Sequence, residues 1–82
     1  MPGVAYIGSK DSRNDTKNQG SSRVFANGLG VVRLGDRDTR NDTMVQASSS
    51  VYADGIKVCR IGDKDSRNDT ITTGSSTVIV GG

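Results

Sequence analysis

Histidine and tryptophan are absent from this sequence, and cysteine and proline occur once each. Without histidine, the chain lacks the commonest general base and metal-binding side chain. The single Cys59 excludes an internal disulfide. The chain has many serines but no histidine to activate one of them as a nucleophile. A catalytic triad of the usual kind is therefore excluded, and we expect no enzymatic activity.

Aromatic residues are also scarce, at 4% of the chain, and hydrophobic residues reach only 32%. A chain of 82 residues with this composition forms one domain with a small core. The net charge of +2 comes from interleaved bases and acids. With no basic stripe and no stacking platform, we expect no nucleic-acid partner. We also expect no signal peptide and no membrane span, because the apolar runs are short.

What the sequence does contain is one polar hexapeptide, written three times. It occurs as DSRNDT at 11–16, DTRNDT at 38–43 and DSRNDT at 65–70. The spacing of 27 residues holds along the whole chain. We therefore predict a single domain, 1–82, built from three repeats at 1–27, 28–54 and 55–81.

Within each repeat the pattern is typical of strands. Asn27-Gly28 and Asp54-Gly55 each lie between two β-rich runs, which favours a tight type I′ hairpin. A third hairpin is interrupted by the chain ends, so residues 1–7 are expected to pair with residues 77–81. The pieces TMVQA and TITTG predict a third short strand in each repeat. The predicted fold is all-β, with about three short strands per repeat.

Alternation along the second hairpin strand assigns its faces. Ile7, Leu34 and Ile61 share a face with Cys59 and its counterparts Ala5 and Val32. Tyr6, Arg33 and Arg60 are expected on the opposite face. Cys59 is then a small buried hydrophobic residue rather than a reactive thiol.

Several phrases recur in a fixed order: VVRLGD at 31–36, VCRIGD at 58–63, and SSRVFANG, SSVYADG and SSTVIVGG before each hairpin turn. In this arrangement the chain resembles the PAAR-repeat (proline-alanine-alanine-arginine) proteins. That family caps the trimeric central spike of type VI secretion systems and contractile phage tails. The resemblance implies a small cone or pyramid with pseudo-threefold symmetry. It also implies a structural spike-tip protein that helps pierce the target cell envelope.

The resemblance implies a trimeric β-helical spike protein as partner and transient contact with the target membrane. Its expected location is a phage virion tail tip, or the bacterial cytoplasm before delivery into a target cell. Three near-copies in one chain can present three equivalent patches to a trimer. The candidate docking residues are Val24, Val51 and Val78.

The sequence departs from the family pattern in two places. Tyr6 and Ser9 stand where the other two repeats have arginine and aspartate. The family also holds a zinc ion at its apex through histidines and a cysteine, whereas this chain offers one thiolate. Tetrahedral structural zinc needs four donors, so we expect no zinc; calcium at the hexapeptides is the one alternative to a chain without a cofactor.

The hexapeptides supply the candidate apex, and three interpretations remain open. In the first, arginines and aspartates of the three copies form ion pairs around the axis. The residues concerned are Asp11, Arg13, Asp15, Asp38, Arg40, Asp42, Asp65, Arg67 and Asp69. In the second, the oxygen-rich stretch 36–42 binds calcium. In the third, the side chains shape a solvated turn.

An alternative function follows from the second interpretation. The chain could be a small threefold β-repeat module that binds calcium or carbohydrate through its DSRNDT loops. Sugar sites commonly use an aromatic face, and Tyr6, Phe25 and Tyr52 lie outside the hexapeptides. This favours the spike-tip interpretation.

Overall fold

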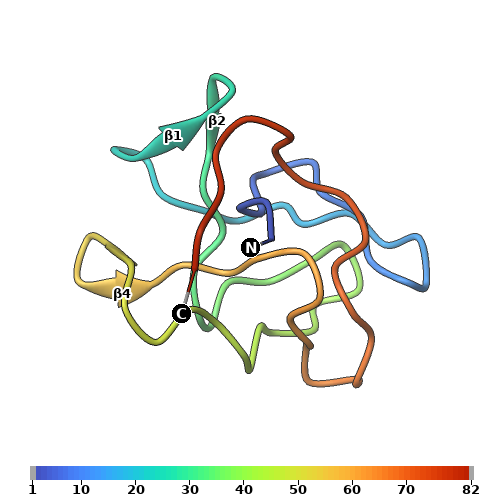
Figure 1. Ribbon diagram of the computed structural model, residues 1–82. Helices are drawn as coiled ribbons and strands as arrows, with labels where there is room; N and C mark the ends of the chain where they lie inside the picture. Colours follow the sequence, from blue (N-terminus) through green and yellow to red (C-terminus); the bar gives the residue numbers. More distant parts are fainter. Residues whose placement is uncertain (1, 82) are drawn as a thin grey trace.

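The regular structure of this protein consists of two short antiparallel hairpins. The computed structural model describes residues 2–81. Strands β1 (Phe25–Ala26) and β2 (Leu29–Gly30) form one hairpin, and β3 (Tyr52–Ala53) and β4 (Ile56–Lys57) form the other (Figure 1). The described residues contain no helix, which confirms the all-β class. Consequently no described segment is a helix that could cross a membrane.

Both hairpins turn where the sequence predicts. Asn27 and Gly28 have φ of 54° and 78°, and Asp54 and Gly55 have φ of 56° and 77°. Positive φ at both central residues is the requirement of a type I′ turn, which asparagine, aspartate and glycine meet most readily. The pairing of Phe25 with Gly30 fixes the register of the first hairpin.

The interrupted third hairpin forms across the chain ends. Gly3 and Ile79 make an antiparallel bridge. The amide of Val4 donates to the carbonyl of Val78, and the amide of Val80 donates to that of Pro2, each at 2.9 Å. The expected pairing of the two ends is confirmed within the described residues, and Met1 lies outside them.

The third predicted strand of each repeat is reduced to single bridges. Met44 bridges Asp65 and Ile71 bridges Asp11, so each piece meets the hexapeptide of another repeat at one position. The hexapeptides turn sharply at asparagines with φ near 70°, namely Asn14, Asn41 and Asn68. A strand cannot extend along a partner that curves away, so the expectation of three strands per repeat was wrong.

The core has two layers, and the predicted alternation describes only one of them. Ala5, Val32 and Cys59 are completely buried, with Met44 and Ile71 packed against them. The residues directly before these three in the sequence, Val4, Val31 and Val58, are also buried. They belong to a separate cluster with Ala26, Ala53 and Val80. The strand therefore runs between two apolar clusters. Leu34, expected on the core face, is 39% exposed.

A buried serine organises the entry to each hairpin. Oγ of Ser21 accepts hydrogen bonds from the amides of Arg23 and Val24, and Ser48 and Ser75 do the same in their repeats. Ser75 also donates to the side chain of Asn27, which lies in another repeat's turn. These serines are turn-forming groups, and the contacts between repeats hold the hairpins against one another.

Candidate functional site

Each hexapeptide is folded by its own first aspartate. Oδ1 of Asp11 accepts hydrogen bonds from the backbone amides of Arg13 at 3.0 Å and Asp15 at 2.9 Å. Asp38 and Asp65 bind the amides two and four residues ahead in the same way. A side chain that satisfies nearby amides stabilises a turn. The turn-forming interpretation of the hexapeptide therefore describes its local structure.

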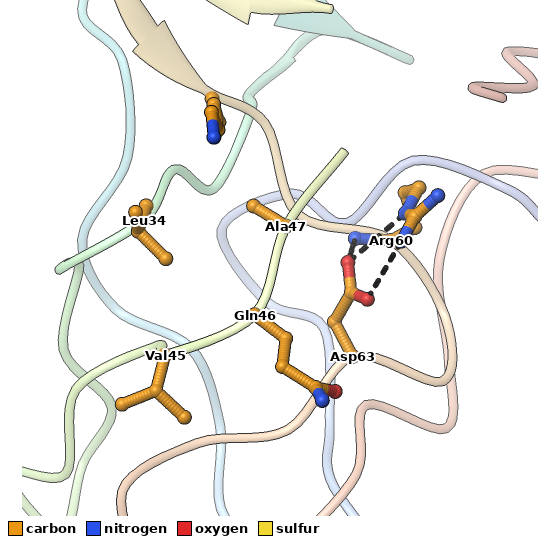
Figure 2. Close-up of a pocket in the computed structure, with 7 residues that line it drawn as sticks. Leu34, Val45, Gln46, Ala47, Arg60 and Asp63 are labelled. Carbon is orange, nitrogen blue, oxygen red and sulfur yellow. Dashed lines mark hydrogen bonds and ion pairs between the residues drawn. The ribbon is translucent and has the colours of Figure 1, made fainter. Parts of the chain in front are cut away.

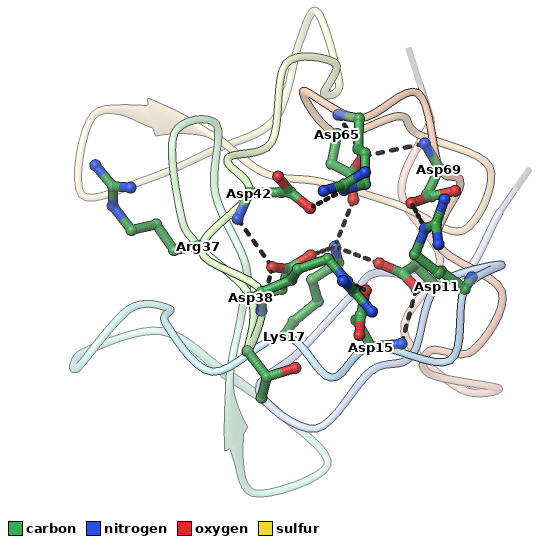
Figure 3. Close-up of polar contacts among 12 residues, drawn as sticks. Asp11, Asp15, Lys17, Arg37, Asp38, Asp42, Asp65 and Asp69 are labelled. Carbon is green, nitrogen blue, oxygen red and sulfur yellow. Dashed lines mark hydrogen bonds and ion pairs between the residues drawn. The ribbon is translucent and has the colours of Figure 1, made fainter.

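The same three aspartates converge on one lysine. Nζ of Lys17 lies 3.3 Å from Oδ2 of Asp11, 3.1 Å from that of Asp38 and 3.3 Å from that of Asp65 (Figure 3). The side chain of Lys17 is 1% exposed and those of the three aspartates are 0% exposed. An ammonium group has three donors and no acceptor, so three carboxylates from three repeats use its capacity fully.

Lys17 breaks the repeat pattern at this position. Its counterparts in the second and third repeats are Met44 and Ile71, both buried in the apolar core. Burial alone would lower the pKa of Lys17, but the hydrogen bonds and charge of Asp38, with those of Asp11 and Asp65, raise it above 10.5. The ammonium therefore stays charged and compensates part of the buried negative charge.

Around this centre, the hexapeptide arginines form a closed ring of ion pairs between repeats. Each Nε lies close to Oδ2 of an aspartate in another hexapeptide. The pairs are Arg13 with Asp69 at 3.3 Å, Arg40 with Asp15 at 2.9 Å, and Arg67 with Asp42 at 3.2 Å. The arginine side chains are almost half exposed, so each pair contributes little alone. Together the pairs link all three repeats.

The structure brings all nine residues of the candidate apex into one cluster, which we call the hexapeptide cluster. Asp11, Asp38 and Asp65 form its buried centre, and the other six form its outer ring. Geometrically, three groups of these aspartates bring carboxylate oxygens within 4.8 Å of one another, as calcium would need. In the central group, however, the Lys17 ammonium already contacts all three carboxylates.

The arginine of the family-like motif forms a forked pair with the aspartate three residues ahead. Arg33 donates from its backbone amide and Nε to Oδ2 of Asp36, and from Nη2 to Oδ1. Arg60 and Asp63 repeat these contacts. In the first repeat, the amide of Tyr6 donates to Oγ of Ser9 instead. Tyr6 and Ser9, the two residues that differ from the motif, are thus hydrogen-bonded to each other, and the turn is kept although both motif residues are replaced.

The candidate docking valines are partly exposed at the entry to the three hairpins. Val24, Val51 and Val78 are 39%, 38% and 40% exposed. The following residue in each repeat is an exposed large apolar side chain as well: Phe25, Tyr52 and Ile79. The β1–β2 and β3–β4 hairpins lie on the left in Figure 1, and the blue loop with residues 11–16 lies on the right. These two hairpins are thus separate from the first loop of the hexapeptide cluster.

Lys17 is the residue of this cluster that sequence reasoning missed. Its signal was present, since a lysine occupies a position that is apolar in the other two repeats. Cys59, by contrast, lies where it was expected. It is buried, its thiol donates to the carbonyl of Gln46, and burial raises its pKa to about 12.

Comparison with known proteins adds no relative. No protein-family model matches the chain, and no curated protein matches it either.

Proposed function

We propose that this chain is a structural, non-enzymatic tip protein that caps the trimeric β-helical spike of a contractile injection machine and helps it pierce a target envelope. The machine is a phage tail or a type VI secretion system, as the PAAR resemblance implies. In this proposal the three repeats form a pseudo-threefold cone. The hairpins form its base, and the hexapeptide cluster forms its point.

The observation that carries the proposal is the repetition of exposed apolar side chains at corresponding hairpin positions. Val24, Val51 and Val78 are equally exposed, and Phe25 and Tyr52 beside them are more than half exposed. A trimer offers three identical patches, which three corresponding patches on one chain can match. Large contiguous apolar patches are typical of interaction surfaces, and in this proposal the recurring hairpin residues form such a patch.

The size of the molecule supports the use of all three hairpins together. A stable interface buries about 800 Å² on each partner. This is roughly a fifth of the 4158 Å² that the whole chain exposes. A single hairpin with strands of two residues cannot supply such an area, so in this proposal the spike contacts all three repeats at once.

The hexapeptide cluster supports the role of a rigid point. Its arginines and aspartates tie each repeat to both others, and Lys17 joins three repeats through one nitrogen. A small domain without disulfides commonly needs a metal or assembly to stay folded. In this proposal the buried ion-pair centre takes the place of the apex metal of the family.

Binding to purified trimeric spikes tests the proposal. The chain is mixed with β-helical spike proteins from a phage tail and from a type VI secretion system, and sedimentation velocity measures the stoichiometry. We expect one chain per trimer with at least one of these spikes. We also expect a melting temperature that rises with spike concentration through linkage.

Matched variants locate the interface. Phe25→Ser with Tyr52→Ser should weaken spike binding at least tenfold, whereas Arg40→Gln, in the hexapeptide cluster, should leave it unchanged. Failure to bind either spike, or loss of binding through Arg40→Gln alone, would overturn the docking model. For the alternative module, a calcium ion at the central carboxylates would have to displace Lys17, and the aromatic side chains that a sugar site commonly uses lie outside the hexapeptides.

A further inference from the structure

A pocket of about 360 Å³ lies between the second and third repeats (Figure 2). Its lining comes from both repeats: Leu34, Val45, Gln46, Ala47, Lys57, Arg60 and Asp63. This volume is within the range of ligand-binding sites in proteins. None of the lining residues belongs to the hexapeptide cluster or to the hairpin positions proposed for spike docking.

The pocket arises from a break in the repeat pattern. At the corresponding positions the first junction has Gly20 and Gly30, and a Cβ on Gly30 would lie 2.2 Å from the carbonyl oxygen of Ser21. The third junction has Gly74 and Gly3, where a Cβ on Gly3 would lie 1.9 Å from a backbone oxygen. Those two junctions are therefore closed by direct backbone contact.

The second junction has side chains at both positions, Ala47 and Lys57. In the closed junctions, an isoleucine packs directly against the glycines: Ile7 against Gly30 and Ile61 against Gly74. Here Leu34 takes the isoleucine's place and remains 39% exposed. The backbone hydrogen bond across the junction, from Leu34 to Lys57, is kept at 2.8 Å. The pocket thus opens at the side chains while the backbone pairing is preserved.

The lining combines apolar side chains with hydrogen-bond donors. Leu34, Val45 and Ala47 supply the apolar part. The charge of Arg60 is matched by Asp63 in a forked pair, as Figure 2 shows. Within residues 2–81, neither the Lys57 ammonium nor the amide nitrogen of Gln46 donates a hydrogen bond to a side chain or carbonyl.

These open donors leave the pocket with one unmatched positive charge and no unmatched negative one. A ligand that complements it carries a carboxylate for Lys57, a carbonyl for the amide of Gln46 and a branched apolar group for Leu34 and Val45. A polypeptide with an apolar residue next to an acidic one has all three. Its main-chain carbonyl supplies the acceptor for the amide of Gln46.

We propose that this pocket docks an acidic polypeptide segment of a second partner, with one copy per chain. The count follows from the repeat pattern, since the glycines close the corresponding positions of the other two junctions. The inference does not rest on the proposed function, because the lining residues and the stoichiometry differ from those proposed for the spike.

Titration of the isotopically labelled full chain with the peptide acetyl-Ser-Ile-Asp-Ser-amide tests the proposal by NMR. We expect saturable shifts at the amides of Val45, Gln46 and Ala47, with one site per chain. The same peptide with asparagine in place of aspartate should bind about tenfold more weakly, because it loses the charge-assisted hydrogen bond. Isovalerate, a free branched carboxylate, should bind more weakly than the peptide.

Two variants and a control complete the test. Lys57→Met should weaken peptide binding about tenfold, whereas Lys10→Met, in the first repeat, should not change it. Ala47→Gly with Lys57→Gly restores the glycine pair of the closed junctions and should abolish binding. A chain that shows no saturable shifts, or shifts unaffected by Lys57→Met, overturns the proposal. Isovalerate binding as tight as that of the peptide overturns the assignment to a polypeptide.

Discussion

Lys17 and Asp38 belong to different repeats and form a buried ion pair in which Nζ lies 3.1 Å from Oδ2. The same nitrogen contacts Asp11 and Asp65, so one side chain of the first repeat completes a centre to which all three contribute. Repetition supplies three carboxylates, and a departure from repetition supplies their counterion. Without Lys17, three carboxylates would face one another in a buried space.

Replacement of Lys17 by methionine, the residue of the second repeat, should destabilise the fold strongly. Removing one partner from a buried ion pair leaves uncompensated charge and costs about 3–5 kcal/mol. Urea unfolding of Lys17→Met should show this loss at pH 7. Lowering the pH toward 4 should recover part of the stability, because protonation removes the repulsion between the carboxylates. Loss of stability with no recovery in acid would indicate a packing effect instead.

Moving the lysine to another repeat should rescue the fold. In the double variant Lys17→Met and Met44→Lys, the ammonium approaches the same three carboxylates from the second repeat. We expect this variant to regain at least half of the free energy of unfolding lost by Lys17→Met alone. The single variant Met44→Lys is the control and should be destabilised by a second buried charge. No rescue would mean that the three repeats do not present corresponding positions to one centre.

The stability of the protein should be flat between about pH 5 and 9, since the chain has no histidine to titrate there. Burial alone would raise the pKa of Asp38, but amide hydrogen bonds and the Lys17 ammonium lower it below 3.8. Asp38 therefore contributes stability above its unfolded pKa, and this contribution is lost as the pH falls through the lower folded value.

At alkaline pH, the buried thiol of Cys59 is the first group whose ionisation lowers the stability of the fold. Burial raises the pKa of its thiol from 9.0 to about 12, so unfolding is favoured as the pH rises above 9. The raised pKa of Lys17 adds a further loss above 10.5. Melting curves from pH 3 to 11 check both limits. The variant Cys59→Ala carries the residue that the first repeat has at the corresponding position, Ala5. Its loss of stability should begin at a higher pH than that of the native chain.

Sequence patterns captured the parts of this fold that depend on local backbone preferences. Asn27-Gly28 and Asp54-Gly55 predicted both hairpins because positive φ restricts the residues that a type I′ turn accepts. The two-layer core was missed, because alternation treats a strand as having one buried face, whereas Val31 and Val32 are both enclosed by neighbouring repeats. Lys17 was missed for a related reason, since its burial depends on carboxylates that converge only after the repeats have assembled.

Cys59 should be unreactive in the folded protein. Its side chain is buried and its thiol remains protonated at neutral pH, whereas thiolate is the nucleophile. With the disulfide reagent DTNB at pH 8, we expect no modification over hours in buffer and full modification within minutes in concentrated denaturant. Rapid reaction in buffer would show that the junction beside Gln46 opens readily.

Two substitutions in the second hexapeptide separate its turn from its ion pair. Asn41 has φ of 69°, and a residue with Cβ other than asparagine or aspartate adopts this region at a cost of about 1–2 kcal/mol. Asn41→Ala should lose about this amount of stability at every salt concentration, and Asn41→Gly should lose much less.

Arg40→Gln removes only the exposed pair with Asp15, so its smaller effect should vanish in 1 M salt, where the Debye length is about 3 Å. If Arg40→Gln were as damaging as Asn41→Ala, and equally so in high salt, the outer ring would be a principal source of stability rather than a surface link between repeats. Thermal unfolding of the three variants in low and high salt distinguishes these outcomes.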